Sequence, residues 1–146
     1  MKLSTKVRYG TRAMLDLAVH YSDEPVLLKD IAKRQEVSLK YLDRIFSSLR
    51  AAGLVKSLRG ARGGFILNIP PSRITVNQIL EALEGPLELV ECVKNKNFCH
   101  RVDSCVARDI WHEVGKSMEA VLKAKTLEDL VIRDRDKKRV SKMYYI

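Results

Sequence analysis

The fold is decided by residues 28–69, which read LKDIAKRQEVSLKYLDRIFSSLRAAGLVKSLRGARGGFILNI. The first part of this stretch contains two helical patterns. Apolar residues at helical spacing mark first a short helix and then a longer one: Leu28, Ile31 and Ala32, followed by Leu42, Ile45, Phe46 and Leu49. Residues 35–37 form a turn between them, Ser38 is a suitable N-cap for the second helix, and Gly53 supplies a left-handed C-terminal residue. This order of elements predicts a helix-turn-helix motif.

A β-hairpin is expected directly after this motif. Residues 54–58 form one predicted strand, and Phe65, Leu67 and Ile69 alternate on the next. The connection RGARGG at residues 59–64 contains glycines, which let the backbone turn sharply and approach a phosphate or a groove floor closely. Its arginines, Arg59 and Arg62, can enter a minor groove of DNA. An ordinary hairpin loop needs the glycines but has no use for the two arginines, so we interpret the hairpin as the wing of a winged helix.

The second helix of the motif presents polar and charged side chains on its outer face: Lys40, Asp43, Arg44, Ser47 and Arg50. Arginine and lysine can reach guanine edges in a major groove, and a carboxylate can accept a hydrogen bond from cytosine N4. Any surface helix looks somewhat similar, so the position within the motif and before the wing supports the interpretation. We therefore expect double-stranded DNA, at a palindromic promoter site, as a partner.

Outside this stretch the patterns are helical. We expect a helix over residues 4–21, a helix that begins with the capping box of Thr75 and Gln78, and a long amphipathic helix over residues 104–125. The long helix carries an apolar stripe that should not face water: Ile110, Val114, Met118 and Val121. A short helix over residues 127–132 follows. The fold class predicted is mainly α with a small β-hairpin wing, formed by a winged helix-turn-helix DNA-binding domain and a long dimerisation helix.

All three cysteines lie in one polar segment: Cys92, Cys99 and Cys105 are spaced C-x6-C-x5-C. An odd number does not suit a disulfide framework, and structural zinc sites bring ligands in pairs about two to four residues apart, which this spacing lacks. Three thiolates in one loop suit a metal or an iron–sulfur cluster better. The alternative, a buried thiol that fills the core, is open to Cys92 beside Leu89 and Val90. It does not suit Cys99 and Cys105, which lie among polar residues.

Charge divides the chain, whose net charge is +9, into three regions. Residues 1–73, the predicted DNA-binding region, hold 14 basic and 6 acidic side chains. Residues 74–132, the predicted cluster-binding loop and dimerisation helices, hold 7 basic and 10 acidic side chains. Residues 133–146, predicted to be a charged and flexible tail, hold 6 basic and 2 acidic side chains. A basic lobe joined to a non-basic one is expected of a nucleic-acid binder with a separate regulatory part. Lysines that serve only to keep the protein soluble would explain the net charge equally well.

The compartment is inferred from what the chain lacks. No stretch approaches the ~20 apolar residues of a membrane helix, and residues 1–9 are polar and basic with no apolar run behind them. We expect a cytoplasmic protein without a membrane partner. In the cytoplasm thiols stay reduced, and cysteines are more often ligands than disulfides.

The chain resembles the iron–sulfur cluster-sensing winged-helix transcriptional regulators of the IscR type, over about its first 132 residues. The matching segments are MKLSTK at residues 1–6, AMLD at 13–16, YL at 41–42, FS at 46–47, AGLV at 52–55, RGARGG at 59–64, the three cysteines, and TLEDL at 126–130. The resemblance implies a homodimer whose long helices pair, and a regulator, expected to be a repressor, of iron–sulfur cluster biogenesis genes. Each subunit would hold a cluster on the three cysteines, 2Fe-2S by this resemblance, while the related nitric-oxide sensors leave 4Fe-4S open. Recognition-helix contacts would fall on Lys40, Asp43 and Arg44, and the wing arginine would be Arg59.

The sequence departs from this family at the fourth cluster ligand. The family's histidine three residues after the third cysteine is Arg108 here, and the helix-1 aspartate of the related nitric-oxide sensors is Arg8. The fourth ligand is therefore unassigned, with four candidates: Glu91, His100, Asp103 and His112.

Two alternative functions stay open, a nitric-oxide or iron-status sensor on the same scaffold and a cluster-free regulator controlled by a protein partner. An enzyme is not expected, because the chain has three scattered histidines and no Ser/His/Asp grouping.

Overall fold

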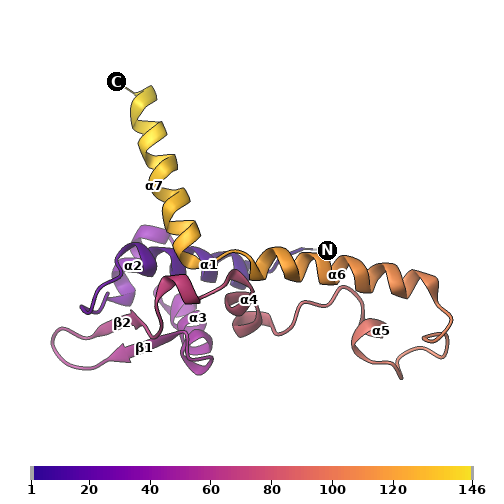
Figure 1. The fold of residues 1–146 in the computed structure, drawn as a ribbon. Helices are drawn as coiled ribbons and strands as arrows, with labels where there is room; N and C mark the ends of the chain where they lie inside the picture. Colours follow the sequence, from indigo (N-terminus) through magenta and orange to yellow (C-terminus); the bar gives the residue numbers. More distant parts are fainter. Residues whose placement is uncertain (1, 146) are drawn as a thin grey trace.

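The structure is a computed structural model that describes residues 2–145, so the parts of the predictions that concern Met1 and Ile146 lie outside it. It is mainly helical, with one two-stranded antiparallel hairpin, as predicted (Figure 1). The elements in chain order are α1 (Thr5–Val19), α2 (Leu28–Gln35), α3 (Leu39–Ala51), β1 (Val55–Leu58), β2 (Gly64–Leu67), the 3₁₀ turn η1 (Pro71–Arg73), α4 (Val76–Glu84), α5 (Glu91–Lys94), α6 (Val106–Lys123) and α7 (Leu127–Tyr144).

Local signals in the sequence set most helix ends. The Ser38 side chain accepts a hydrogen bond from the Tyr41 backbone N–H at 3.2 Å, as expected of an N-cap. Thr75 and Gln78 form the predicted capping box at the start of α4. After α3, Gly53 has φ +76°, the left-handed conformation that ends a helix. The predictions of these helix ends are confirmed.

One apolar core joins the N-terminal helices to α4 and the start of α7. Its fully buried side chains come from α1, α2, α3, β1, the segment before α4, α4 and α7: Met14, Leu17, Ile31, Leu42, Ile45, Phe46, Leu49, Val55, Ile74, Ile79 and Leu127. A Cβ at Gly10 would overlap the Cδ1 atom of Leu83, so the missing side chain lets α1 approach α4 closely. The core is therefore continuous across residue 73, where the predicted DNA-binding region ends.

The hairpin is attached to the helices by backbone and side-chain contacts. Val26, between α1 and α2, exchanges two backbone hydrogen bonds with Phe65 of β2, at 2.9 and 2.8 Å. A Cβ at Gly64 would overlap the Val26 backbone, so this close pairing requires glycine there. The Asn68 side chain donates to the Gly53 carbonyl at 2.9 Å. The hairpin is thus fixed to the segments that precede and follow the helix-turn-helix.

Two helix starts far apart in the chain lie side by side. Val76 donates to the Lys125 carbonyl at 2.8 Å, and Leu127 donates to the Ile74 carbonyl at 2.9 Å. The start of α4 and the start of α7 are therefore joined at one point. The cysteine segment and α6 leave the core after α4 and return to it there (Figure 1).

The last helix is longer than the sequence suggested. The predicted end at residue 132 is wrong, and residues 133–144, expected to be a flexible tail, continue α7 to Tyr144. Pairs one turn apart favour the helix, since Lys138 contacts Asp134 at 2.6 Å. Beyond the core, α7 projects from the body on the side away from the hairpin (Figure 1).

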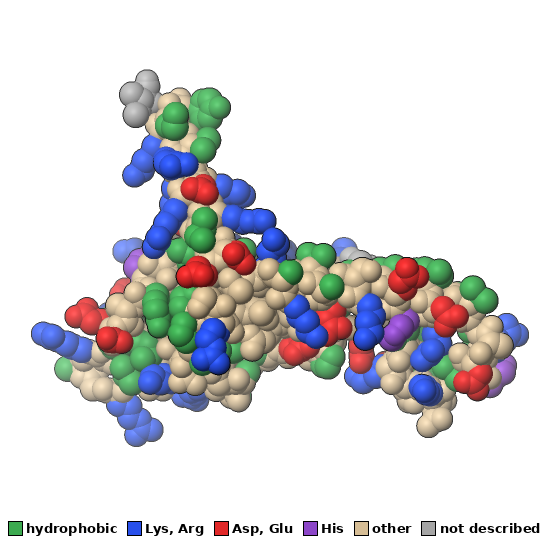
Figure 2. All heavy atoms as spheres, viewed as in Figure 1, with side chains coloured by type: hydrophobic (Ala, Val, Ile, Leu, Met, Phe, Trp, Pro, Cys, Tyr) green, Lys and Arg blue, Asp and Glu red, His purple; other side chains and the backbone are tan. Residues whose placement is uncertain are grey.

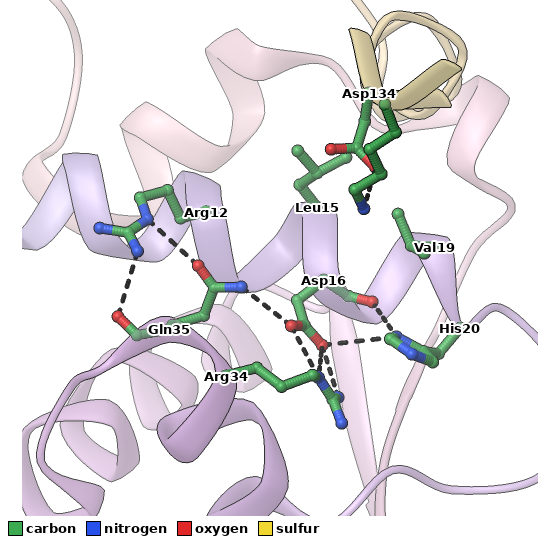
Figure 3. A pocket seen from close by; sticks show the side chains of 9 residues that line it. Arg12, Leu15, Asp16, Val19, His20, Arg34, Gln35 and Asp134 are labelled. Carbon is green, nitrogen blue, oxygen red and sulfur yellow. Dashed lines mark hydrogen bonds and ion pairs between the residues drawn. The ribbon is translucent and has the colours of Figure 1, made fainter. Parts of the chain in front are cut away.

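A buried carboxylate ties α1 to α2. Asp16 is 7% exposed, and Arg34 donates to both of its oxygens, with the shortest contact at 2.6 Å. Gln35 donates to the same carboxylate at 2.9 Å (Figure 3). Burial alone would raise the pKa of the Asp16 carboxyl, but the hydrogen bonds from Arg34 and Gln35 and the charges of Arg34 and His20 outweigh it and lower the pKa below its ordinary value of 3.8.

Replacement of this carboxylate should destabilise the fold in a pH-dependent way. Asp16→Asn keeps the size of the side chain but removes the charge that Arg34 contacts, so the free energy of unfolding should fall by about 1–3 kcal/mol near neutral pH. A carboxylate whose pKa is lower in the folded protein than in the unfolded chain stabilises the fold at pH values above the unfolded pKa. This stabilisation is lost as pH falls through the folded-state pKa. The difference from the unmodified protein should therefore shrink below about pH 4 in urea titrations. Asp23→Asn, at an exposed position, is the control; equal stabilities of the Asp16→Asn variant and the unmodified protein at neutral pH would contradict this role.

Candidate nucleic-acid interface and cysteine segment

The predicted recognition residues of α3 share one exposed face. Lys40, Asp43, Arg44 and Ser47 are all exposed, and their i, i+3, i+4, i+7 spacing places them on one side of the helix. The opposite side is fully buried: Leu42, Ile45, Phe46 and Leu49 each have 0% exposure. The helix can therefore present its polar side to a groove without disturbing the core.

The wing is held in a fixed relation to α3. Phe65 of β2 packs edge-on against Phe46 of α3, with ring centroids 4.8 Å apart. Arg59 and Arg62 are exposed in the connection between the strands. Figure 2 shows basic side chains around this end of the molecule. The α3 face and the wing arginines thus belong to one packed unit.

The charges of this unit are available to a ligand. Within residues 2–145, the basic side chains Lys40, Arg44, Arg59 and Arg62 form no ion pair with a carboxylate. Such side chains can neutralise phosphates or reach base edges without first giving up a partner in the protein.

The cysteines lie between the core and the long helix. Cys92 is in α5, Cys99 is in the segment after it, and Cys105 is the N-cap of α6. All three are free thiols and half-buried. Their chemistry fits a thiolate-ligated group, but in the part of the chain that the structure describes no three His, Cys, Asp or Glu side chains lie close enough to hold a metal ion. The three cysteines therefore lie in one region, but their sulfur atoms are not close enough together to bind a metal ion.

Arg108 has a structural partner at the position where the resemblance implied a ligand. Its Nε donates to the main-chain oxygen of Cys92 at 2.9 Å and so fastens α5 to α6. The four candidates for a fourth ligand are all exposed: Glu91, His100, Asp103 and His112. The arginine contact links residues 16 positions apart, which the sequence did not indicate.

A cavity of about 420 Å³, lined by charged, polar and apolar side chains, lies between α1, α2 and α7 and was not predicted from the sequence. Figure 3 shows Asp16, Arg34 and His20 facing one another, with Gln35 between Asp16 and Arg12 and with Asp134 of α7 beyond them. Arg12 donates to Gln35, and Arg34 donates to Asp16. Asp16, between Leu15 and Leu17 of α1, was the available signal, since an aspartate is almost never fully buried without a partner.

The long helix α6 leaves most of its predicted apolar stripe uncovered, and only Met118 of the four stripe residues is half-buried. None of its 18 residues is buried. Ile110 is 48% exposed, Val114 38% and Val121 62%, and Trp111 beside them is 45% exposed. A helix whose apolar side faces water over this length is typical of an unpartnered interaction surface.

Comparisons with known proteins agree with this architecture. Residues 3–133 match the family model Rrf2, described as an iron-dependent transcriptional regulator. The chain is 44% identical over 131 residues to the Protein rrf2 of Nitratidesulfovibrio vulgaris, covering 90% of this chain and 87% of that one. It is 39% identical to the HTH-type transcriptional regulator CymR of Bacillus subtilis over 146 residues and the full length of both. It is 37% identical to the HTH-type transcriptional regulator IscR of Aliivibrio salmonicida over 141 residues, 97% of this chain and 83% of that one.

Solved structures show the same fold. CymR, the global cysteine regulator of B. subtilis, superposes with a TM-score of 0.76 at 39% identity and covers 91% of this chain and 98% of its own. The IscR of T. potens also gives a TM-score of 0.76, at 42% identity, and covers 94% of this chain and 90% of its own.

The resemblance inferred from sequence is thereby confirmed. Among residues 2–145 no helix is both long and apolar enough to cross a membrane. The winged helix-turn-helix, the matching family model and the related regulators establish that this chain belongs to the Rrf2 family and is a DNA-binding transcriptional regulator rather than an enzyme.

Proposed function

We propose that this protein regulates, as a repressor, the genes of iron–sulfur cluster biogenesis, and senses cluster status through a 2Fe-2S cluster held by Cys92, Cys99 and Cys105. The observation that carries the proposal is the placement of three free, half-buried thiols in one segment between the DNA-binding core and an uncovered helix. Relatives named IscR, which share 37–39% of their residues with this chain, support it. A regulator that acts on promoter DNA is expected in the cytoplasm.

The cysteine segment can influence the DNA-binding unit because it is anchored at both ends. It leaves from α4, which packs in the core, and continues into α6, which returns to the core beside the start of α4. When bound, a cluster supplies iron–thiolate bonds that oxidants or nitric oxide can break. To ligate it, the segment around the three cysteines must close, while Arg108 keeps Cys92 near α6. The cluster can affect DNA affinity only if the protein with an open segment and the protein with a closed segment differ in their fit to DNA.

The proposed reading of DNA assigns a role to each exposed side chain. Lys40 and Arg44 are suited to guanine edges, Asp43 to cytosine N4, and Ser47 to either a base or a phosphate. Arg59 and Arg62 of the wing are suited to the minor groove or its flanking phosphates. The packing of Phe65 against Phe46 supports this assignment, because it joins the wing to α3.

Two copies are proposed to pair through α6. The stripe of Ile110, Val114 and Val121 is exposed in the single chain, and burial against the same stripe of a second copy would remove it from water. A twofold arrangement would present two α3 helices to one palindromic site, about 34 Å apart.

A second candidate is a cluster-free regulator controlled by a protein partner. The full-length similarity to CymR, the global cysteine regulator of B. subtilis, favours a signal other than an iron–sulfur cluster. A nitric-oxide or iron-status sensor on the same scaffold differs from the main proposal only in the signal. The first experiment below separates the cluster-free candidate from the others.

Cluster binding is tested on protein purified without oxygen. The unmodified protein should be brown or red and contain iron and sulfide in equal amounts, with about two irons per chain for a 2Fe-2S group. The variant with Cys92→Ala, Cys99→Ala and Cys105→Ala should be colourless, whereas Ser104→Ala should keep the colour. The coloured protein and the triple variant should differ in affinity for at least one promoter at the same salt concentration. Colourless, iron-free unmodified protein would favour the cluster-free candidate.

DNA reading is tested with arginine substitutions. Arg59→Ala should weaken operator binding by about 1–3 kcal/mol, and Arg44→Ala should relax the preference at one base pair, since each loses a direct contact. Fluorescence anisotropy with operator variants measures both effects. Arg135→Ala, on α7 away from the hairpin, is the control. If a folded Arg44→Ala/Arg59→Ala variant keeps the full operator affinity, the assignment of these contacts is wrong.

Dimer formation is tested on α6. Val114→Glu places a charge in the proposed apolar interface and should shift the protein to monomers that bind a palindromic site poorly. Lys116→Glu, on another side of the helix, should remain dimeric. Sedimentation equilibrium gives the mass of each variant, and a monomeric unmodified protein would rule out the pairing.

A further inference from the structure

The first residue of α3 is an apolar side chain that the fold does not use. Leu39 is 51% exposed. Among the residues that the structure describes, the half-buried side chains packed against the core include Val37 and Tyr41, on either side of it, but not Leu39. The cap of α3 is supplied by Ser38, through its hydrogen bond from the Tyr41 backbone. Leu39 is therefore required neither for the core nor for the start of the helix.

This side chain adjoins the recognition residues of α3. Leucines exposed singly are common on protein surfaces, so the position of Leu39 is what distinguishes it. Leu39 directly precedes Lys40 and lies one helical turn before Asp43, and side chains one turn apart are neighbours on a helix surface. In a helix-turn-helix the N-terminal residues of the second helix contact base edges, and Leu39 is at that end of α3. It is thus an apolar side chain at the edge of an otherwise polar recognition face.

The major groove of DNA offers one kind of apolar group to such a side chain. The C5-methyl group of thymine is apolar, whereas the other groups on the base edges are hydrogen-bond donors and acceptors. A leucine that covers this methyl group removes apolar surface of both partners from water. The charged side chains of the face are suited to G·C pairs, since Lys40 and Arg44 fit guanine and Asp43 fits cytosine. An A·T pair therefore has no charged reader among them.

We propose that Leu39 recognises one thymine in each half of the operator by contact with its C5-methyl group. The Cβ atoms of residues one turn apart are about 6 Å apart, and successive base pairs are about 3.4 Å apart. The thymine therefore lies within about two base pairs of the cytosine that Asp43 contacts. Leu39 adds the choice of an A·T pair to a face that otherwise selects G·C pairs, and this inference rests on the proposed reading of DNA by α3.

The test combines a substitution in the protein with removal of the methyl group from DNA. A binding site is first selected from random duplexes with the unmodified protein. Each thymidine of that site is then replaced in turn by deoxyuridine, which lacks the C5-methyl group but keeps the base pair. Fluorescence anisotropy at one fixed salt concentration gives the dissociation constant for each combination of protein and duplex.

The loss of the methyl group and the loss of the leucine should not add. The unmodified protein should bind about three- to fivefold more weakly when one particular thymidine of a half-site becomes deoxyuridine, because one apolar contact is lost. Leu39→Ala should bind the thymidine site more weakly by a similar factor, and the same deoxyuridine should weaken this variant no further. Leu39→Met keeps an apolar side chain of similar size and should retain most of the sensitivity to the methyl group.

Ile132→Ala is the matched control. Ile132 is also 51% exposed, and it lies on α7, outside α3 and the wing. A general effect of losing exposed apolar surface would appear in this variant as well, so it should bind both duplexes as the unmodified protein does. Alanine is a better helix former than leucine, so Leu39→Ala should keep α3 folded, and circular dichroism checks this.

The outcomes separate this inference from the proposed reading of DNA. Full operator affinity in a folded Arg44→Ala/Arg59→Ala variant overturns both. If these arginines contribute but no thymidine responds to the loss of its methyl group, the assignment of Leu39 alone is wrong. It is also wrong if Leu39→Ala and deoxyuridine weaken binding additively at every position, because another residue then contacts the methyl group.

Discussion

The contact between Asp16 and Arg34 is the constraint on which the arrangement of helices depends. Asp16 lies on the buried side of α1, a helix that also packs against α3, α4 and α7. A carboxylate can occupy that position only when its charge is matched, and Arg34 and Gln35 at the end of α2 donate four hydrogen bonds to it, one of which is also the ion pair. Burying the charge of Asp16 without a partner would cost free energy. The orientation of α2 against α1 that pairs Asp16 with Arg34 is therefore favoured. The turn after α2, and with it α3, follows from that orientation.

The proposed DNA-binding surface, formed by α3 and the wing, is built on this arrangement as one packed unit. The buried side of α3 fills part of the core. On this side the ring of Phe46 packs against Phe65 of β2, and this contact holds the hairpin against α3. The pairing of Val26 with Phe65 closes the hairpin base against the segment between α1 and α2. Few rotatable segments remain between the helix face and the wing, so little conformational entropy is left to lose on binding DNA.

The sequence predicted those features whose cause is local. The caps at Ser38 and Thr75, the left-handed Gly53 and the apolar spacing of α3 each depend on residues within one or two turns, and they occur where they were expected. The partner of Asp16 lies 18 positions away and that of Arg108 lies 16 away, and no spacing rule connects them. The end of α7 was misjudged because a dense run of charges favours disorder by composition, while the i,i+4 pair of Asp134 and Lys138 favours a helix. The distances between the three sulfur atoms depend on how an irregular segment folds, which the spacing of cysteines does not determine.

The junction of the two helix starts, at Thr75 and Thr126, has a consequence for how this chain can change. Because backbone hydrogen bonds join Val76 to Lys125 and Leu127 to Ile74, the chain from α4 through α6 is an excursion that begins and ends at one place. Lengthening such an excursion adds only a slowly growing closure entropy and shifts no core residue. Insertions, deletions or side-chain exchanges between residues 88 and 105 should leave the winged helix intact. A single scaffold of this kind can therefore acquire or lose a sensor without having to rebuild the part that reads DNA.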